Sequence, residues 1–134
     1  MRQHLVTFDE LQIGQELAPV SFEISSAVVE KYLIATGDAS TPRTDPQVVP
    51  PVMTAIVVRR TTERLVSPPG GIHAKQHYRF RAPMHAGDVV TTDAVIADKY
   101  VKKGRQYVVI ESRTRRGDGE LAVTGRTTRI WAQT

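Results

Sequence analysis

The sequence of 134 residues contains no cysteine. This absence excludes disulfide bonds, thiolate metal sites and a cysteine nucleophile, and it favours a reducing compartment such as the cytoplasm. Long apolar runs are also missing, and the first ten residues mix Arg2, His4, Asp9 and Glu10 with isolated apolar residues. We therefore expect neither a membrane span nor a signal peptide.

Aromatic residues are few, at 6% of the chain. Lysine and arginine outnumber aspartate and glutamate by 18 to 14, which gives a formal net charge of +4, but no aromatic residue lies in a basic motif typical of nucleic-acid binding. A charge of this size is ordinary for a small soluble domain, so we expect no nucleic-acid partner. Hydrophobic residues make up 40% and charged residues 24%, which indicates an ordinary globular chain, and the length predicts one domain over residues 1–134.

The first half of the sequence predicts one strand and two helices. Residues 15–24 alternate weakly and indicate a short strand, after which Ser25 or Ser26 can cap a helix that ends at Gly37. Residues 38–51 are rich in Pro, Ser, Thr and Asp and predict a loop. Pro51 suits the first turn of a second helix over residues 52–66, whose first half is apolar on nearly every side and is expected to be buried.

The second half predicts four strands, over residues 72–82, 88–97, 106–115 and 120–131. Turn signals separate them, the strongest being Gly117-Asp118-Gly119, and their succession indicates an antiparallel meander. Both faces of the strand over residues 88–97 are partly apolar, which is typical of a sheet that covers a helix on one side and pairs with another subunit along its edge. The order of elements predicts an α+β domain in which a sheet of about five strands curls round a central helix.

The segment YLIATGDASTPRTDP, residues 32–46, resembles the hydratase motif of the MaoC-like (R)-specific enoyl-thioester hydratases and dehydratases, which have the hot-dog fold. Gly37-Asp38 and Thr44-Asp45-Pro46 match the motif, whereas Ser40 stands where it has Asn, Thr41 where it has Pro, and Arg43 where it has His. The resemblance extends over nearly the whole chain. It implies hydration or dehydration of a 2-enoyl or 3-hydroxyacyl thioester, carried by coenzyme A or a carrier protein, without a cofactor.

The resemblance implies catalytic roles for Asp38 and for the residue at position 43. In the family, an Asp and a His activate water, and backbone N–H groups near the central helix hold the thioester oxygen. Asp38 remains available as a base, but Arg43 cannot exchange protons because its pKa lies above about 12. A nearby Arg43 is also expected to lower the pKa of Asp38 and weaken it as a base.

Three interpretations of Arg43 stay open. The chain is a hydratase in which Asp38 works alone or another residue replaces the histidine, or Arg43 clamps an anionic group of an altered substrate. Alternatively, the chain is a non-catalytic acyl-binding or stabilising subunit of a competent hydratase. A thioesterase of the same fold would need a carboxylate on the central helix, where only Glu63 is available.

The remaining predictions concern binding. The substrate-binding residues are expected to be Ser40, Val52, Met53 and Ile56, the last three in the core or along an acyl tunnel. His73 and His77 are about 13 Å apart on a strand, too far to share a metal, so no metal site is expected. The basic cluster Lys99, Lys102, Lys103 and Arg105 is interpreted as solvated surface, with phosphates of coenzyme A or an acidic carrier as the alternative. The resemblance implies a homodimer or a heterodimer with a hot-dog paralogue.

Overall fold

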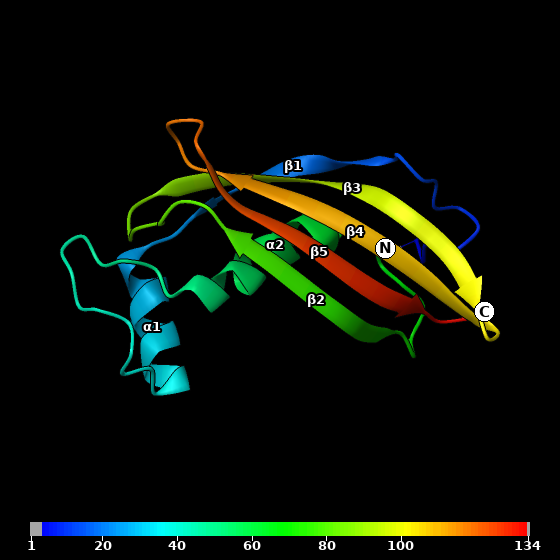
Figure 1. The fold of residues 1–134 in the computed structure, drawn as a ribbon, viewed down its shortest axis with the longest axis horizontal. Helices are drawn as coiled ribbons and strands as arrows, with labels where there is room; N and C mark the ends of the chain where they lie inside the picture. Colours follow the sequence, from blue (N-terminus) through cyan, green and yellow to red (C-terminus); the bar gives the residue numbers. More distant parts are fainter. Residues whose placement is uncertain (1–3, 134) are drawn as a thin grey trace.

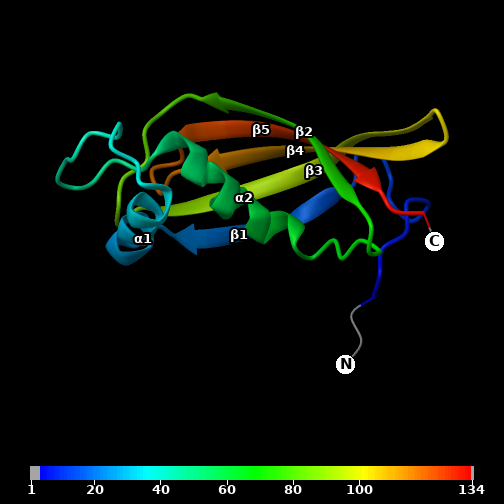
Figure 2. The same cartoon turned by 90° about the horizontal axis from the view of Figure 1, so that it is seen from below.

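A computed structural model describes residues 4–133 of the chain. Strand β1 (Glu16–Glu23) leads to helix α1 (Ser26–Thr36), and a loop leads on to a 3-10 turn, η1 (Pro51–Met53), and helix α2 (Thr54–Thr62). The remaining strands are β2 (Ile72–Phe80), β3 (Val89–Lys102), β4 (Arg105–Arg115) and β5 (Leu121–Trp131). Helix α2 lies across one face of the sheet, and α1 lies at one end of it (Figure 1, Figure 2).

The five strands form one antiparallel sheet in the order β1-β3-β4-β5-β2. This confirms the predicted α+β hot-dog architecture. The predicted meander is correct for β3, β4 and β5 but wrong for β2, which pairs with β5 at the far edge and not with β3. The segment between β2 and β3 therefore crosses over instead of forming a hairpin.

Local sequence explains the β3–β4 hairpin. Lys103 and Gly104 both have positive φ, at 51° and 74°, as the tight turns of two-residue hairpins require. Strand β3 extends five residues past its predicted end at Ala97, because a bulge between Ile96 and Asp98 shifts the register without ending the ladder.

Helix α1 begins and ends as predicted. The Ser25 hydroxyl accepts a hydrogen bond from the Val28 backbone N–H, and Gly37 closes the helix in the left-handed conformation. Helix α2 ends at Thr62, four residues before the predicted end at Val66. The chain turns there and places Leu65 in a core cluster with Trp131 at the end of the sheet away from α1.

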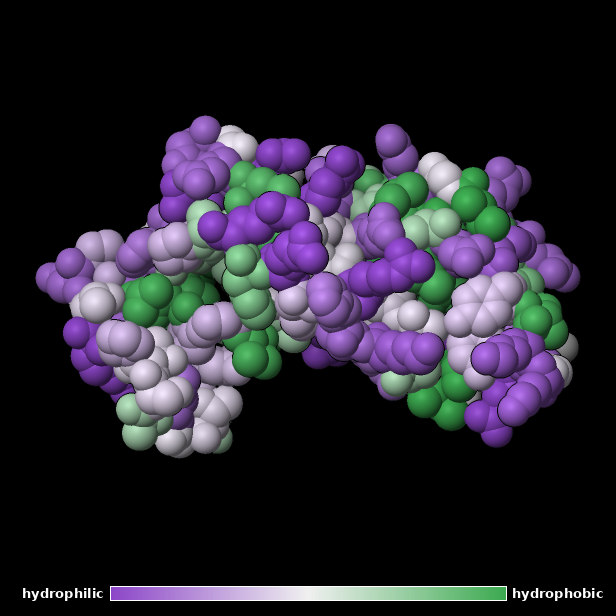
Figure 3. Space-filling view, in the orientation of Figure 1, coloured by the Kyte–Doolittle hydropathy of each residue, from purple (hydrophilic) through white to green (hydrophobic). Residues whose placement is uncertain are grey.

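The sheet has one buried and one solvated face. Along β3, even-numbered residues from Val90 to Ile96 are buried, and odd-numbered ones are more exposed. Val90 shares a core cluster with Val57 of α2, whereas Ala94 and Ile96 share one with Leu11 and Leu65. The outer face is mainly hydrophilic, and the surface is hollowed between the part that carries α1 and the sheet (Figure 3). Helix α2 packs mainly against β1 and β3, so it lies to one side of the sheet's centre.

Within residues 4–133, none of the helices combines the length and the apolar character that crossing a membrane would demand.

Candidate functional site

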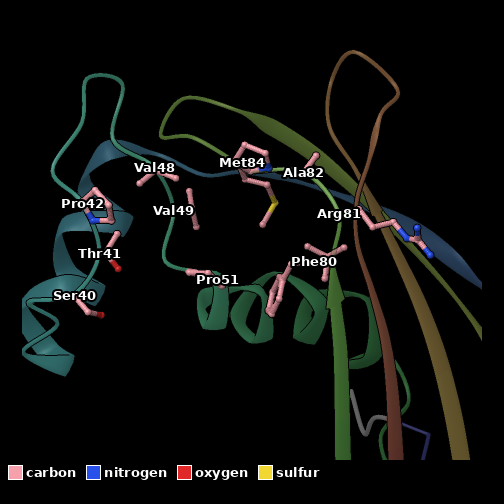
Figure 4. Close-up of a pocket in the computed structure, with 12 residues that line it drawn as sticks. Ser40, Thr41, Pro42, Val48, Val49, Pro51, Phe80, Arg81, Ala82 and Met84 are labelled. Atoms are coloured by element: carbon pink, nitrogen blue, oxygen red, sulfur yellow. The ribbon is translucent and has the colours of Figure 1, made fainter.

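A cavity of about 520 Å³ lies between the α1–α2 loop and the end of β2 (Figure 4). The α1–α2 loop provides one wall, and the segment from Phe80 to Met84 provides the other. Backbone hydrogen bonds hold the two walls together: the Val49 N–H donates to the Met84 carbonyl, and the Ala86 N–H donates to the Gln47 carbonyl, each at 2.8 Å. The lining is mostly apolar, as expected for a cavity that holds a hydrocarbon group.

The Asp38 carboxylate, directly after the end of α1, accepts four hydrogen bonds from its own loop. Its Oδ1 accepts hydrogen bonds from the Ser40 N–H at 2.8 Å, the Ser40 hydroxyl at 2.9 Å and the Thr41 N–H at 3.0 Å. Its Oδ2 accepts one from the Thr41 hydroxyl at 2.6 Å. The bonds from Thr41 and then those from Ser40 hold the pKa of Asp38 far below its usual range, because they stabilise the charged carboxylate.

Arg43 pairs with Glu30, and within residues 4–133 it makes no ion pair with Asp38. Its exposed guanidinium lies 3.4 Å from the Glu30 carboxylate of α1, and Glu30 is its one ion-pair partner among residues 4–133. The pKa of Asp38 is therefore low, in the predicted direction, but the predicted cause is wrong. Ser40 and Thr41 lower it, and Arg43 does not contribute.

The predicted substrate-binding residues fall in three different environments. Ser40 lines the cavity. Met53 is completely buried in the core, and the side chains of Val52 and Ile56 lie on the outer face of α2, where the two residues are 64% and 39% exposed. The prediction that the first half of the second helix is buried on several sides was therefore wrong, because Val52 and Ile56 are exposed while the polar Thr54 is buried.

Residues missed by sequence reasoning form most of the apolar lining. They come from the Val48-Val49 pair and from the segment after β2, and they include Phe80 and Met84. An isolated β-bridge between Val48 and His85 brings these segments together. The apolar pair Val48-Val49 after a polar loop was an available signal, but its partner in the β2–β3 crossover depends on tertiary structure.

The cavity lacks a pair of groups suited to proton transfer. Among its lining residues the titratable one is Arg81, whose side chain extends away from the cavity in Figure 4. Ser40 and Thr41 present hydroxyls, but both are hydrogen-bonded to Asp38. The lining suits an apolar group beside a few polar atoms, at one end of a hot-dog sheet.

Comparison with known proteins agrees with this fold. The model of the FAS1-like dehydratase domain region matches residues 11–125, and the chain belongs to this family. A sequence comparison with curated proteins finds no match.

Solved structures share the fold at low sequence identity. The unliganded R-hydratase PhaJ1 from Pseudomonas aeruginosa is 18% identical with a TM-score of 0.79, over 97% of this chain and 88% of that one. The MaoC-like dehydratase from Rhodospirillum rubrum is 15% identical with a TM-score of 0.77, over 96% and 99%. The HadBC 3R-hydroxyacyl-ACP dehydratase complex from Mycobacterium tuberculosis is 21% identical with a TM-score of 0.76, over 88% and 96%.

Proposed function

We propose that this chain is an acyl-thioester-binding subunit of a hydratase or dehydratase, and that a partner hot-dog chain supplies the proton-transfer pair. The single observation that carries the proposal is the state of Asp38 and Arg43. Four hydrogen bonds engage the Asp38 carboxylate, and Arg43 pairs with Glu30. General acid–base catalysis needs a group whose pKa lies near the working pH, and the hydrogen bonds from Thr41 and Ser40 hold the pKa of Asp38 far below that range. A guanidinium has no acceptor atom with which to take up a proton.

The second candidate is hydration by this chain alone, with Asp38 as base and Arg43 as an anion clamp. Membership of a dehydratase family favours it, as does the attachment of Asp38 to the cavity wall through Ser40 and Thr41. A thioesterase has less support, because Glu63 is exposed at the end of α2, away from the cavity lining.

The experiment measures binding and turnover separately. A panel of trans-2-enoyl-CoA thioesters is titrated by calorimetry, and hydration is followed by loss of enoyl absorbance. We expect binding with no hydration by the unaltered protein, and hydration to appear in Arg43→His. Arg43→Gln is the matched control, since it removes the guanidinium without adding a proton exchanger.

Two results would contradict the proposal. Hydration by the unaltered chain that disappears in Asp38→Asn would assign the base to Asp38. Failure of every thioester to bind would exclude an acyl-binding role.

Pairing with a second hot-dog chain is part of this proposal: a competent hot-dog chain for turnover, and a second copy of this chain for thioester binding when that partner is absent. Strand β2 is nine residues long, lies at the sheet edge and pairs only with β5 among the described strands. An open edge of this kind is a template for another strand. Two similar structures are of complexes, HadBC and ChsH1-ChsH2, and sedimentation of the purified chain, alone and with a candidate partner, tests whether it forms dimers.

A further inference from the structure

Arg129 on β5 is a half-buried cation without a counter-charge. Its guanidinium reaches the Thr62 hydroxyl on α2 at 3.4 Å, and no carboxylate within the described residues lies within ion-pair distance of it. Burial lowers the pKa of Arg129, which indicates lost hydration, and among the described residues no anionic partner replaces it. By contrast, Arg126 on the outer face of the same strand is paired with Glu111.

Arg129 lines a second cavity, of about 320 Å³, at the start of β2. The other lining residues are His73, the end of β5 and the Ser67–Gly71 loop. His73 lies opposite Arg129 in the β2–β5 ladder, so a second group able to carry positive charge borders the same space. An uncompensated guanidinium in a concave polar site is suited to an anion, and to phosphate above all.

The cavity between the α1–α2 loop and the end of β2, where the acyl group is proposed to bind, is called the acyl cavity. Within one chain the second cavity is remote from it. Phe80 at the end of β2 lines the acyl cavity, and Ile72 at its start lines the second one. Eight residue steps of about 3.3 Å separate them by roughly 26 Å. A single thioester bound to one chain would therefore have to run the whole length of β2 to reach both cavities.

Pairing through β2 changes this arrangement. Two copies joined edge to edge into a continuous sheet are related by a two-fold axis perpendicular to it, so their β2 strands run antiparallel. Gln76 is the midpoint of the nine-residue strand β2, so a pairing that uses the whole strand is centred on Gln76 and places Ile72 opposite Phe80 of the second copy. Strand β5, with Arg129, is then two inter-strand spacings, roughly 10 Å, from that copy's β2, and Arg129 projects from the same face of the sheet.

We infer that Arg129 acts in trans, binding a phosphate of the thioester's carrier arm while the acyl group lies in the acyl cavity of the other subunit. This rests on the proposed acyl-binding function. The ligand chemistry is a phosphate ester, which coenzyme A and the phosphopantetheine arm of a carrier protein both contain. Arg129 is a binding residue and takes no part in proton transfer.

The first test compares three probes with the same acyl group: the acyl-CoA, the acyl 4′-phosphopantetheine and the acyl pantetheine, which has no phosphate. We expect Arg129→Gln to weaken acyl-CoA binding by about 10- to 100-fold, the value of one or two charged hydrogen bonds, and to leave acyl-pantetheine binding unchanged. Equal losses for both phosphorylated probes assign the phosphate that the two carriers share. A loss confined to acyl-CoA assigns a phosphate of its nucleotide.

Two variants control for structural damage. Arg126→Gln removes a cation from the opposite face of β5 and is expected to bind all three probes normally. Arg129→Lys keeps the charge and loses the planar fork, so intermediate acyl-CoA binding is expected. Equal acyl-CoA affinity for Arg129→Gln and the unaltered protein would overturn the inference and leave the proposed function standing. Failure of the unaltered protein to bind even acyl pantetheine would instead overturn both.

The second test asks whether the residue acts in trans. Val48→Trp is expected to fill the acyl cavity and abolish binding. Differently tagged Val48→Trp and Arg129→Gln chains are co-expressed, and the mixed dimer is purified through both tags. We expect one tight acyl-CoA site per mixed dimer, because the open cavity of one chain faces the Arg129 of the other. Only weak binding in the mixed dimer would show that Arg129 acts within its own chain.

Discussion

Replacing Thr54 by valine is expected to stabilise the fold, although the same change at Thr92 is expected to destabilise it. Thr54 is completely buried, and its hydroxyl has no hydrogen-bond partner among the described residues. The Thr92 hydroxyl is equally enclosed, but it lies 2.8 Å from the Thr114 hydroxyl and is paired with it. The same Thr→Val substitution therefore removes an unpaired hydroxyl at position 54 and a hydrogen-bonded one at position 92.

The magnitudes follow from the cost of an unpaired buried group. Removing the orphan hydroxyl of Thr54 relieves a desolvation penalty of about 1–3 kcal/mol, and the similar helix propensities of threonine and valine leave this gain nearly unchanged. Thr92→Val leaves Thr114 unpaired and costs a similar amount. In a chain of this length, 1 kcal/mol corresponds to a Tm change of about 3–5 °C, measurable by calorimetry.

The double variant Thr92→Val with Thr114→Val sharpens the test, because replacing both partners by apolar groups of similar shape is nearly neutral. Its Tm is expected to recover most of what Thr92→Val loses. A Thr54→Val protein that melts lower than the unaltered one would refute the reasoning, since its hydroxyl would then have a stabilising partner.

Two further outcomes are expected. Asp38→Asn should lower the free energy of unfolding measured in urea at pH 7, because the folded protein holds the pKa of Asp38 below its unfolded value. The difference between the two proteins should shrink as the pH falls below about 3.9, the usual aspartate pKa. A difference that does not change with pH would contradict this assignment. Gly125→Ala should lower the free energy of unfolding by about 1–3 kcal/mol. A Cβ at this position would lie 2.6 Å from the Ser112 Oγ and 3.1 Å from the Tyr78 ring, which is too close for unstrained packing. An unchanged Tm would show that these side chains move aside.

Much of the fold could be predicted from local sequence signals, and the errors in the prediction concern features that tertiary packing determines. The Ser25 cap, Gly37 and the turn glycines fix element ends through contacts within a few residues, so sequence alone locates them. The position of β2 beside β5 depends on contacts between distant segments, and periodicity carries no information about it. The same holds for α2, where an apolar run suggested burial but the helix packs to one side of the sheet and exposes Val52 and Ile56.

The candidate site divides in the same way. Asp38 followed by Ser40 and Thr41 is a spacing at which hydroxyls and backbone N–H groups reach a carboxylate, so its engagement was open to prediction. The ion pair of Arg43 with Glu30 joins the loop to α1 and needed the folded chain. Ser40, predicted to bind substrate, lies in the cavity wall, whereas Phe80 and Met84 were missed because only the folded chain brings them to the cavity.

The position of β2 in the sheet also sets an order of events during synthesis. Strand β2 emerges from the ribosome before β3, β4 and β5, yet its one described partner, β5, is made last. The segment Ile72–Phe80 therefore has no strand to pair with while β3 and β4 form their hairpin. Nascent chains halted before Leu121 should leave this segment open to chaperones and proteases, and its protection should arise only when β5 has left the exit tunnel.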